Sequence, residues 1–300
     1  MSLEQVAALR KSMLARRAGP PATLEQRRTG FEAQMAAVPL PDDFTADEVL
    51  IRPDLSGLMC GRAGSTREHV LLWLHGGAFI LGSAASYRHM AARLAEAAGC
   101  RVLLLDYRLA PEHPFPAALE DSIAALGWLE EQGFAASQVA IGGDSAGANL
   151  ALAAVQDWLN KEQLAPAVLW LISAYLDLTH SGQSVQERAD RDPFVDPATM
   201  PGTAATYLGE HDREDPRASP LFGSTRGLPP TLIQVGSDEV LFSDSERLYN
   251  AIRQAGGRAV FQEWAGMIHV WPLFAHVIDE GQWAIQQGGA FLRKVLGTAP

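Results

Sequence analysis

Ser145 is the residue of this chain whose surroundings most clearly predict chemistry. It lies in Gly-Asp-Ser-Ala-Gly at positions 143–147, after the short β-rich run 139–142 and before an alanine-rich segment of helical character. This order predicts a strand, a sharp turn and a helix with the serine at the turn, an arrangement called a nucleophile elbow. Glycines flank the serine because strand and helix approach too closely there for a side chain. The free N–H groups of the helix N-terminus favour an oxyanion at this place.

The base and the acid that such a serine needs follow it in the chain. A serine hydroxyl is a weak nucleophile near neutral pH, so it requires a base within hydrogen-bond reach, which an acid in turn orients. With this type of elbow, the chain order is serine, acid and then histidine. Asp238 follows the predicted strand 231–235, and His269 follows the predicted strand 259–264. Loops at the carboxyl ends of parallel strands are where open sheets place their sites, so we predict Asp238 as the acid and His269 as the base.

Other residues compete for both roles. Glu239 and Asp244 lie close to Asp238, which could itself be only a helix cap or turn residue. Placement just beyond the strand favours Asp238. His276 also follows the last predicted strand, but it lies within an apolar helical stretch, so His269 is the better candidate.

A tetrahedral intermediate needs N–H donors that already point at its oxygen. The backbone of Ala146, the residue after the serine, is expected to supply one. Gly76, Gly77 and Ala78 follow His75 at the end of an apolar strand, where glycines let the backbone turn its N–H groups into a site. A tight turn alone would explain the two glycines, but their position opposite the elbow favours an oxyanion hole.

The elements that position these residues alternate along the chain. Short apolar runs predict strands at 49–51, 58–60, 70–74, 102–105, 139–142, 168–172, 231–235 and 259–264. Helical periodicity predicts helices at 87–98, 117–129, 148–155, 243–255 and in a closing segment that ends at 296. Strands alternating with helices require crossover connections, so the fold class is α/β with a parallel sheet covered on both faces.

Two segments interrupt this alternation. Residues 1–45 carry two amphipathic helices before any strand, and residues 179–220 contain few apolar runs. We therefore expect residues 46–178 and 221–300 to form the catalytic α/β domain, with the other two segments packed on it as a helical cap.

The composition limits the partners. The chain has 300 residues, 47% of them apolar and 20% charged, as in an ordinary globular protein. Its net charge of −11 is not offset by a basic cluster, so nucleic acid and anionic membrane surfaces would be repelled. We predict a small-molecule substrate and no nucleic-acid or membrane partner.

The remaining sequence signals concern location and cofactors. The N-terminus lacks a basic region followed by an apolar core, and no apolar run is long enough to span a bilayer, which predicts a cytoplasmic location. Cys60 and Cys100 are the only cysteines and do not have metal-ligand spacing. No metal or organic cofactor is expected.

Three motifs together resemble a known family. They are His-Gly-Gly-Ala-Phe at 75–79, Asp-Tyr-Arg-Leu-Ala-Pro-Glu-His-Pro-Phe-Pro-Ala-Ala at 106–118, and the elbow at 143–147. In this order they resemble the hormone-sensitive-lipase family of α/β-hydrolases, the bacterial family IV esterases, and the resemblance covers the chain from about His69 onward. The stretches 236–241 and 266–270 are most similar to members described as monoterpene ε-lactone hydrolases or acetyl esterases.

The resemblance implies an eight-stranded sheet, a helical cap that includes the N-terminus, and hydrolysis of short-chain carboxylic esters through an acyl-enzyme. Members often form dimers, although the sequence itself does not indicate an oligomeric state. The chain departs from the family at two places. Ala78 replaces the last glycine of the usual His-Gly-Gly-Gly, and Asp238-Glu239-Val240 replaces the usual Asp-Pro-Leu after the acid.

A set of apolar side chains could line an acyl pocket under the cap, although most aromatic residues in any chain belong to its core. The set comprises Phe31, Met35, Phe79, Phe194, Trp271 and Phe274. A closed, capped pocket would favour short acyl chains or a compact lactone ring.

Two other functions fit the same motifs. The predicted residues would serve an ε-lactone, an amide or a carbamate as well as an ester, because leaving-group preference depends on the shape of the pocket. A protein of another class, which only binds a ligand, is also conceivable, since the plant gibberellin receptors resemble this family and have lost the catalytic histidine. Here His269 stands at the expected place, so the sequence favours a serine carboxylesterase.

Overall fold

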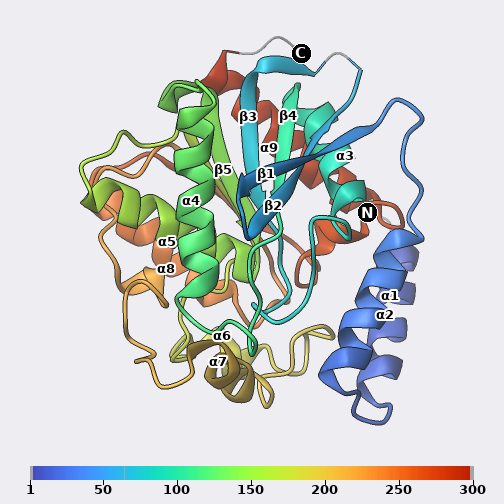
Figure 1. The fold of residues 1–300 in the computed structure, drawn as a ribbon. Coiled ribbons are helices and arrows are strands. Elements are labelled where there is room, and N and C mark those ends of the chain that lie inside the picture. Colours follow the sequence, from blue (N-terminus) through green and yellow to red (C-terminus); the bar gives the residue numbers. More distant parts are fainter. Residues whose placement is uncertain (1–2, 64, 298–300) are drawn as a thin grey trace.

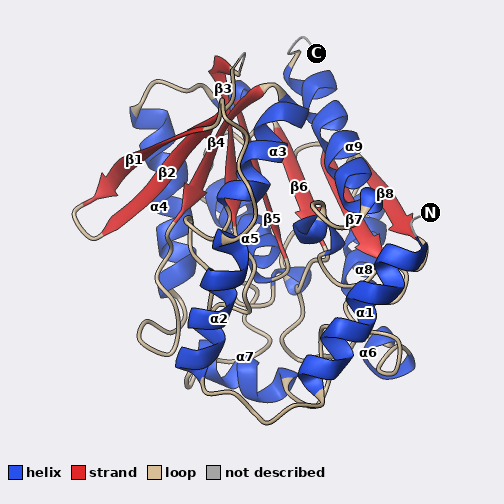
Figure 2. Cartoon of the chain, turned by 90° about the vertical axis from the view of Figure 1, so that its right-hand side faces the viewer, coloured by secondary structure: helices blue, strands red, loops and turns tan. Residues whose placement is uncertain are grey.

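A single sheet of eight strands runs through the protein in the order β1-β2-β4-β3-β5-β6-β7-β8. Figure 1 labels β1 to β5, and Figure 2 also labels β6, β7 and β8. The strands are β1 Thr45–Arg52, β2 Leu55–Gly61, β3 Thr66–Leu74, β4 Cys100–Leu105, β5 Val139–Asp144, β6 Val168–Ile172, β7 Thr231–Gly236 and β8 Ala259–Trp264. The computed structural model describes residues 3–63 and 65–297. Six strands, β4-β3-β5-β6-β7-β8, are parallel, while β2 pairs antiparallel with both β1 and β4. The prediction of an eight-stranded, mostly parallel sheet is confirmed.

Helices cover both faces of the sheet. One layer contains α4 Ala117–Glu131, α5 Ala146–Asn160 and α8 Phe242–Gln254, and the other contains α3 Arg88–Ala98 and α9 Asp279–Leu296. Successive residues of β3 alternate between the two cores: Leu72 and Leu74 join the first, whereas Leu71 and Trp73 join the second. Because both faces are covered, β5, β6 and β7 are buried at every position, and their sequences are correspondingly apolar.

The remaining helices gather at one end of the sheet. They are α1 Leu3–Arg17, α2 Leu24–Ala36, α6 Ser184–Glu187 and α7 Met200–Leu208, and Figure 2 shows α1, α2 and α7 beyond the ends to which the parallel strands point. Short 3-10 turns lie at η1 Ala136–Gln138, η2 Pro220–Phe222 and η3 Trp271–Phe274. No helix within the described residues is both long enough and apolar enough to cross a membrane.

Helix α1 contacts the segment that follows β6. Helix α2 begins with a capping box, in which Thr23 and Gln26 satisfy each other's backbone N–H groups. From α1, Arg10 donates to the carbonyl of Arg191, and Arg17 donates to the carbonyl of Asp192. We propose that residues 1–45 and 179–220 form one cap, because these contacts join them at the carboxyl ends of the parallel strands.

Close packing holds the closing helix on the sheet. A Cβ at Gly288 would overlap the ring of Trp170 in β6, and a Cβ at Gly289 would overlap the backbone carbonyl of Ala97 at the end of α3. The ring of Trp170 also packs edge-on against Trp73, with centroids 5.4 Å apart. The second core therefore depends on a helix surface without side chains at positions 288 and 289.

Replacing Gly289 with alanine should lower the free energy of unfolding by about 1–3 kcal/mol, because the methyl group meets a backbone carbonyl that cannot turn away. Gly30 in α2 has open space beside it, so Gly30→Ala should be neutral or stabilising by up to about 1 kcal/mol. Urea unfolding of the two variants and the wild type measures both effects. A wild-type midpoint for Gly289→Ala would contradict this packing.

Candidate active site

Ser145 occupies the turn between β5 and α5. Its backbone has φ 53° and ψ −117°, a strained conformation for a residue with a side chain. The flanking glycines make this turn possible: a Cβ at Gly147 would overlap the carbonyl of Leu74, and one at Gly143 would overlap the backbone of Gly147. The predicted strand, turn and helix are all present, and the serine stands where β5 meets the N-terminus of α5.

His269 reaches this serine from the loop after β8. Its Nε2 lies 2.9 Å from Oγ of Ser145. Both residues are nearly closed to solvent, with Ser145 8% and His269 2% exposed. Water therefore competes little for the hydrogen bond between them, and the structure brings the two predicted residues together.

Glu239 is the carboxylate that faces the imidazole. Its Oε2 lies 2.9 Å from Nδ1 of His269, and the side chain is fully buried. Its other oxygen accepts hydrogen bonds from the Ser173 hydroxyl at 2.7 Å and from the Gly236 N–H at 2.6 Å. A carboxylate only accepts, so Nδ1 of His269 carries the proton and Nε2 is free to accept one from Ser145.

The prediction that Asp238 orients the histidine is wrong. Its side chain pairs with the guanidinium of Arg10 in α1, and among the described residues it forms no hydrogen bond with the imidazole. Asp244, the other candidate, is buried and accepts the N–H groups of Leu176 and Asp177, so it supports a loop. The signal that could have identified Glu239 was already visible, because this chain has a carboxylate where the family usually has proline.

Burial and nearby charges set the protonation of the site. Burial alone would lower the pKa of His269, but its hydrogen bond with Glu239 and the negative charges of Glu239, Asp192 and Asp144 raise that pKa above its usual 6.5. Burial raises the pKa of Asp144 to about 6, against the hydrogen bond from Tyr87. The surroundings of His269 thus favour the imidazolium that forms when it takes a proton.

The backbone after β3 turns unusually. Gly77, Ala78 and Phe79 all have positive φ, at 123°, 56° and 64°. Within the described chain, the N–H groups of Gly77, Ala78 and Ala146 donate to no protein acceptor. Gly77 and Ala78 are half-buried and Ala146 is fully buried, so these N–H groups are candidates for binding an oxyanion.

The N–H group of Gly76, in contrast, has a hydrogen-bond partner. Its N–H donates to the Tyr87 hydroxyl at 3.0 Å, so the prediction that Gly76 supplies an oxyanion donor is wrong. The same hydroxyl donates to Asp144 at 2.8 Å, and Trp73 donates to the other oxygen of that carboxylate at 3.3 Å. Tyr87, which the sequence did not single out, therefore fixes the loop at Gly76 to the residue beside the nucleophile.

Phe194 is the predicted pocket residue that lies nearest the imidazole. Its ring centroid is 5.6 Å from that of His269 and 6.1 Å from that of Phe274, and 43% of the residue is exposed. Phe31 packs near Tyr87, with centroids 6.3 Å apart, and Met35 is buried in the second core. For Phe31, Met35 and Phe274, contact with substrate stays a prediction.

The other two predicted pocket residues belong to the core. Phe79 is fully buried and stacks on Tyr207 at 3.7 Å between centroids. Trp271 is also fully buried, packs against Trp264 and donates to the carbonyl of Glu280. Neither ring offers a free surface to a substrate, so their assignment to the pocket is not supported.

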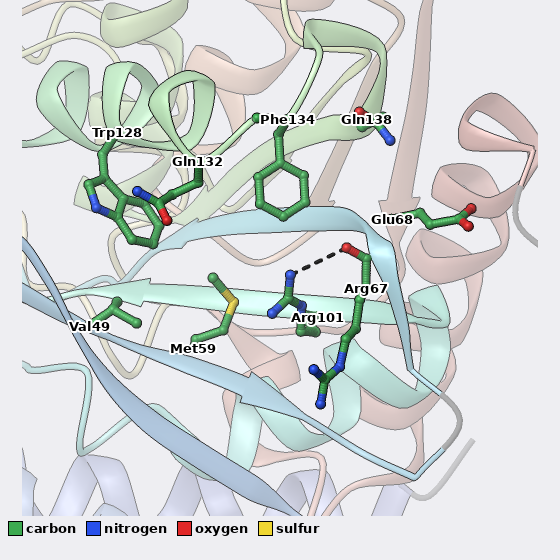
Figure 3. Close-up of a pocket in the computed structure, with 10 residues that line it drawn as sticks. Val49, Met59, Arg67, Glu68, Arg101, Trp128, Gln132, Phe134 and Gln138 are labelled. Atoms are coloured by element: carbon green, nitrogen blue, oxygen red, sulfur yellow. Dashed lines mark hydrogen bonds between the residues drawn. The ribbon is translucent and has the colours of Figure 1, made fainter.

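A cavity of about 410 Å³ opens elsewhere, between the end of α4 and the strands β1, β2 and β4 (Figure 3). Arg101 of β4 lines it and donates to the carbonyl of Arg67, with its guanidinium 5.7 Å from the Phe134 ring centroid. Gln138, also in its lining, precedes β5, and Ser145 follows that strand. The cavity thus lies at the opposite end of the sheet from the serine.

Known proteins resemble this chain in sequence. A family model described as the alpha/beta hydrolase fold matches residues 71–273. An acetyl-hydrolase from Streptomyces hygroscopicus is 46% identical over 227 residues, which cover 76% of this chain and 76% of that protein. An esterase from Acinetobacter venetianus is 36% identical over 225 residues, with 75% and 74% covered.

The whole chain also superposes on solved structures. The crystal structure of an esterase from the bacterial hormone-sensitive lipase family has a TM-score of 0.94 and 38% sequence identity, and the match covers 98% of this chain and 99% of that one. The family model, these relatives and the shared architecture support the same conclusion: the chain belongs to the hormone-sensitive-lipase family of the α/β-hydrolases.

Proposed function

We propose that this protein is a carboxylic ester hydrolase that cleaves short-chain acyl esters with Ser145, His269 and Glu239. The observation that carries the proposal is the buried hydrogen-bond chain from Ser145 Oγ through both nitrogens of His269 to Glu239, with 2.9 Å at each step. Relatives described as acetyl-hydrolase and esterase support the reaction class.

The geometry supports a two-step reaction. Nε2 of His269 accepts the hydroxyl proton as Ser145 Oγ attacks the ester carbonyl carbon, which gives a tetrahedral oxyanion. When this intermediate collapses, the bond to the alkoxy oxygen breaks and His269 gives its proton to the leaving alcohol. A water molecule then loses a proton to His269 and attacks the carbonyl carbon of the acyl-serine. When this second intermediate collapses, its bond to Ser145 Oγ breaks, His269 returns the proton to Oγ, and the carboxylic acid leaves.

Glu239 and the free N–H groups act on the charges of these steps. Glu239 holds the proton on Nδ1 and stabilises the imidazolium of His269. The N–H groups of Gly77, Ala78 and Ala146 would hold the oxyanion, and they need no reorganisation because the loop is already turned.

The closed surroundings of Ser145 and His269 predict a preference for short acyl chains. Ser145 and His269 are almost inaccessible, and Phe194 stands beside the imidazole. Little room is left for a long acyl chain unless the segment that carries Phe194 moves.

Hydrolysis of p-nitrophenyl esters from acetyl to dodecanoyl tests the reaction class and the acyl preference. We expect kcat/KM to peak at or below octanoyl and Ser145→Ala to abolish turnover while its circular dichroism stays that of the wild type. A simple ε-lactone in the same series shows whether a lactone is the better substrate. Turnover that persists in folded Ser145→Ala, or kcat/KM that rises beyond octanoyl, would contradict the proposal.

Neighbouring carboxylates give a matched test of the acid. Glu239→Gln should lower kcat/KM on the order of 10⁴-fold, because an amide oxygen cannot hold the tautomer and charge of His269 as a carboxylate does. Asp238→Asn breaks only a half-exposed ion pair and should change kcat/KM by less than about threefold. The opposite order of losses would restore Asp238 as the acid.

The pH dependence of kcat/KM reports on the free histidine. Protonated His269 cannot accept the serine proton, and its pKa is raised above 6.5, so activity should fall with decreasing pH and reach half of its plateau above pH 6.5. Initial rates with p-nitrophenyl acetate between pH 5 and pH 9 measure this midpoint. A midpoint below 6.5 would show that burial outweighs the neighbouring carboxylates.

A further inference from the structure

The acid turn, residues 237–240, is held by the cap as well as by the sheet. The Ser184 hydroxyl of α6 donates to the Val240 carbonyl at 2.6 Å, and Arg188 donates to the Ser237 carbonyl at 2.5 Å. Asp192 accepts the N–H of Val240 at 3.1 Å. Both backbone groups of Val240, the residue after Glu239, are therefore bonded by residues of the segment 179–220.

Asp192 connects this turn to the segment beside the histidine. Its Oδ2 bonds the N–H of Val240, while its Oδ1 accepts the N–H groups of Phe194 at 2.9 Å and Val195 at 3.0 Å. The residue is 1% exposed. One buried carboxylate thus fixes the distance between the turn that carries Glu239 and the ring that stands beside His269.

The charge of Asp192 also acts on the imidazole. The groups that influence His269 are Glu239 from the acid turn, Asp192 from the cap and Asp144 from the end of β5. All are carboxylates, and the charge of each raises the pKa of His269. Among the described residues, Asp192 forms no hydrogen bond with the ring, so it acts on the histidine through its charge and through its support of the turn that carries Glu239.

We propose that Asp192 is a positioning residue, which sets the orientation of Glu239 and the field at His269 and so couples the cap segment to the catalytic groups. The proposal rests on the proposed function where it concerns turnover. Asp192 forms no hydrogen bond with Ser145 or His269, and its contacts join the turn that carries Glu239 to the backbone of Phe194 and Val195.

The informative variant is Asp192→Asn. It keeps one oxygen for Phe194 and Val195, but it removes the charge and leaves one acceptor where two are needed. Asp196→Asn is the matched control: Asp196 lies in the same segment, is also an aspartate, and pairs with Arg17 without contacting the acid turn.

Turnover gives the first readout. We expect Asp192→Asn to lower the plateau kcat for p-nitrophenyl acetate about tenfold or more, with little change in KM, and to move the acidic limb to lower pH. Asp196→Asn should leave both near the wild-type values. A role in folding alone would lower kcat in proportion to the folded fraction and leave the limb in place, which would overturn the proposal.

NMR titration of His269 gives a readout that needs no turnover. The imidazole signal, assigned by its loss in His269→Ala, should titrate at lower pH in Asp192→Asn than in the wild type and Asp196→Asn. If the Asp192→Asn shift is seen but the wild type has no Ser145-dependent activity, the proposed function is refuted and the positioning role stands. If the wild type is active but Asp192→Asn shows no shift, the positioning role is refuted and the proposed function stands. Should Asp192→Asn fail to fold, the same titration is read on Asp192→Ser, which removes the charge without setting an amide donor against Val240.

Discussion

The buried hydrogen bond between Glu239 and His269 is the interaction on which the rest of the site depends. A carboxylate taken out of water is costly unless it is paired, and this one is satisfied on both oxygens. Glu239 and its two side-chain partners follow neighbouring parallel strands: Ser173 follows β6, Glu239 follows β7 and His269 follows β8. The parallel arrangement is what brings these loops to one edge, where Ser145 leaves β5.

The proposed cap also holds the turn that carries Glu239. The acid turn is closed from outside the sheet by Ser184, Arg188 and Asp192, which reach the backbone on both sides of Glu239. Helix α1 in turn holds that cap segment through Arg10 and Arg17. The order of contacts runs from the N-terminal helix to the segment after β6, then to the acid, and finally to the histidine. A site of this kind is sensitive to residues that never touch substrate.

Local pattern was sufficient for the fold, because apolar strands and amphipathic helices alternate clearly and the elbow has a specific glycine spacing. Ser145 and His269 followed from the same pattern. The identity of the acid did not follow, because two consecutive carboxylates, Asp238 and Glu239, come after β7. Which of them faces His269 depends on how the turn is held by Ser184, Arg188 and Asp192, which lie far away in the sequence. Sequence placed a carboxylate after this strand but could not orient it.

The predictions for Gly76, Phe79 and Trp271 failed for the same reason. Which way the N–H of Gly76 points is decided by the hydroxyl of Tyr87, a partner in the next helical region. Whether Phe79 faces a pocket or the core is decided by Tyr207, which is distant in sequence, and the same choice for Trp271 is decided by Trp264 at the end of the preceding strand. Each of these outcomes is a tertiary contact, whereas periodicity reports only on the residue's own element.

We propose that Glu239, through His269, activates Ser145. The most direct measurement is the rate at which diethyl p-nitrophenyl phosphate modifies the protein, followed by p-nitrophenol release and by mass spectrometry of the peptide that contains Ser145. We expect one diethylphosphoryl group on Ser145. It should form at similar rates in the wild type and Asp238→Asn, and orders of magnitude more slowly in Glu239→Gln. Equal rates in the wild type and Glu239→Gln, or modification of Ser145→Ala at the wild-type rate, would contradict it.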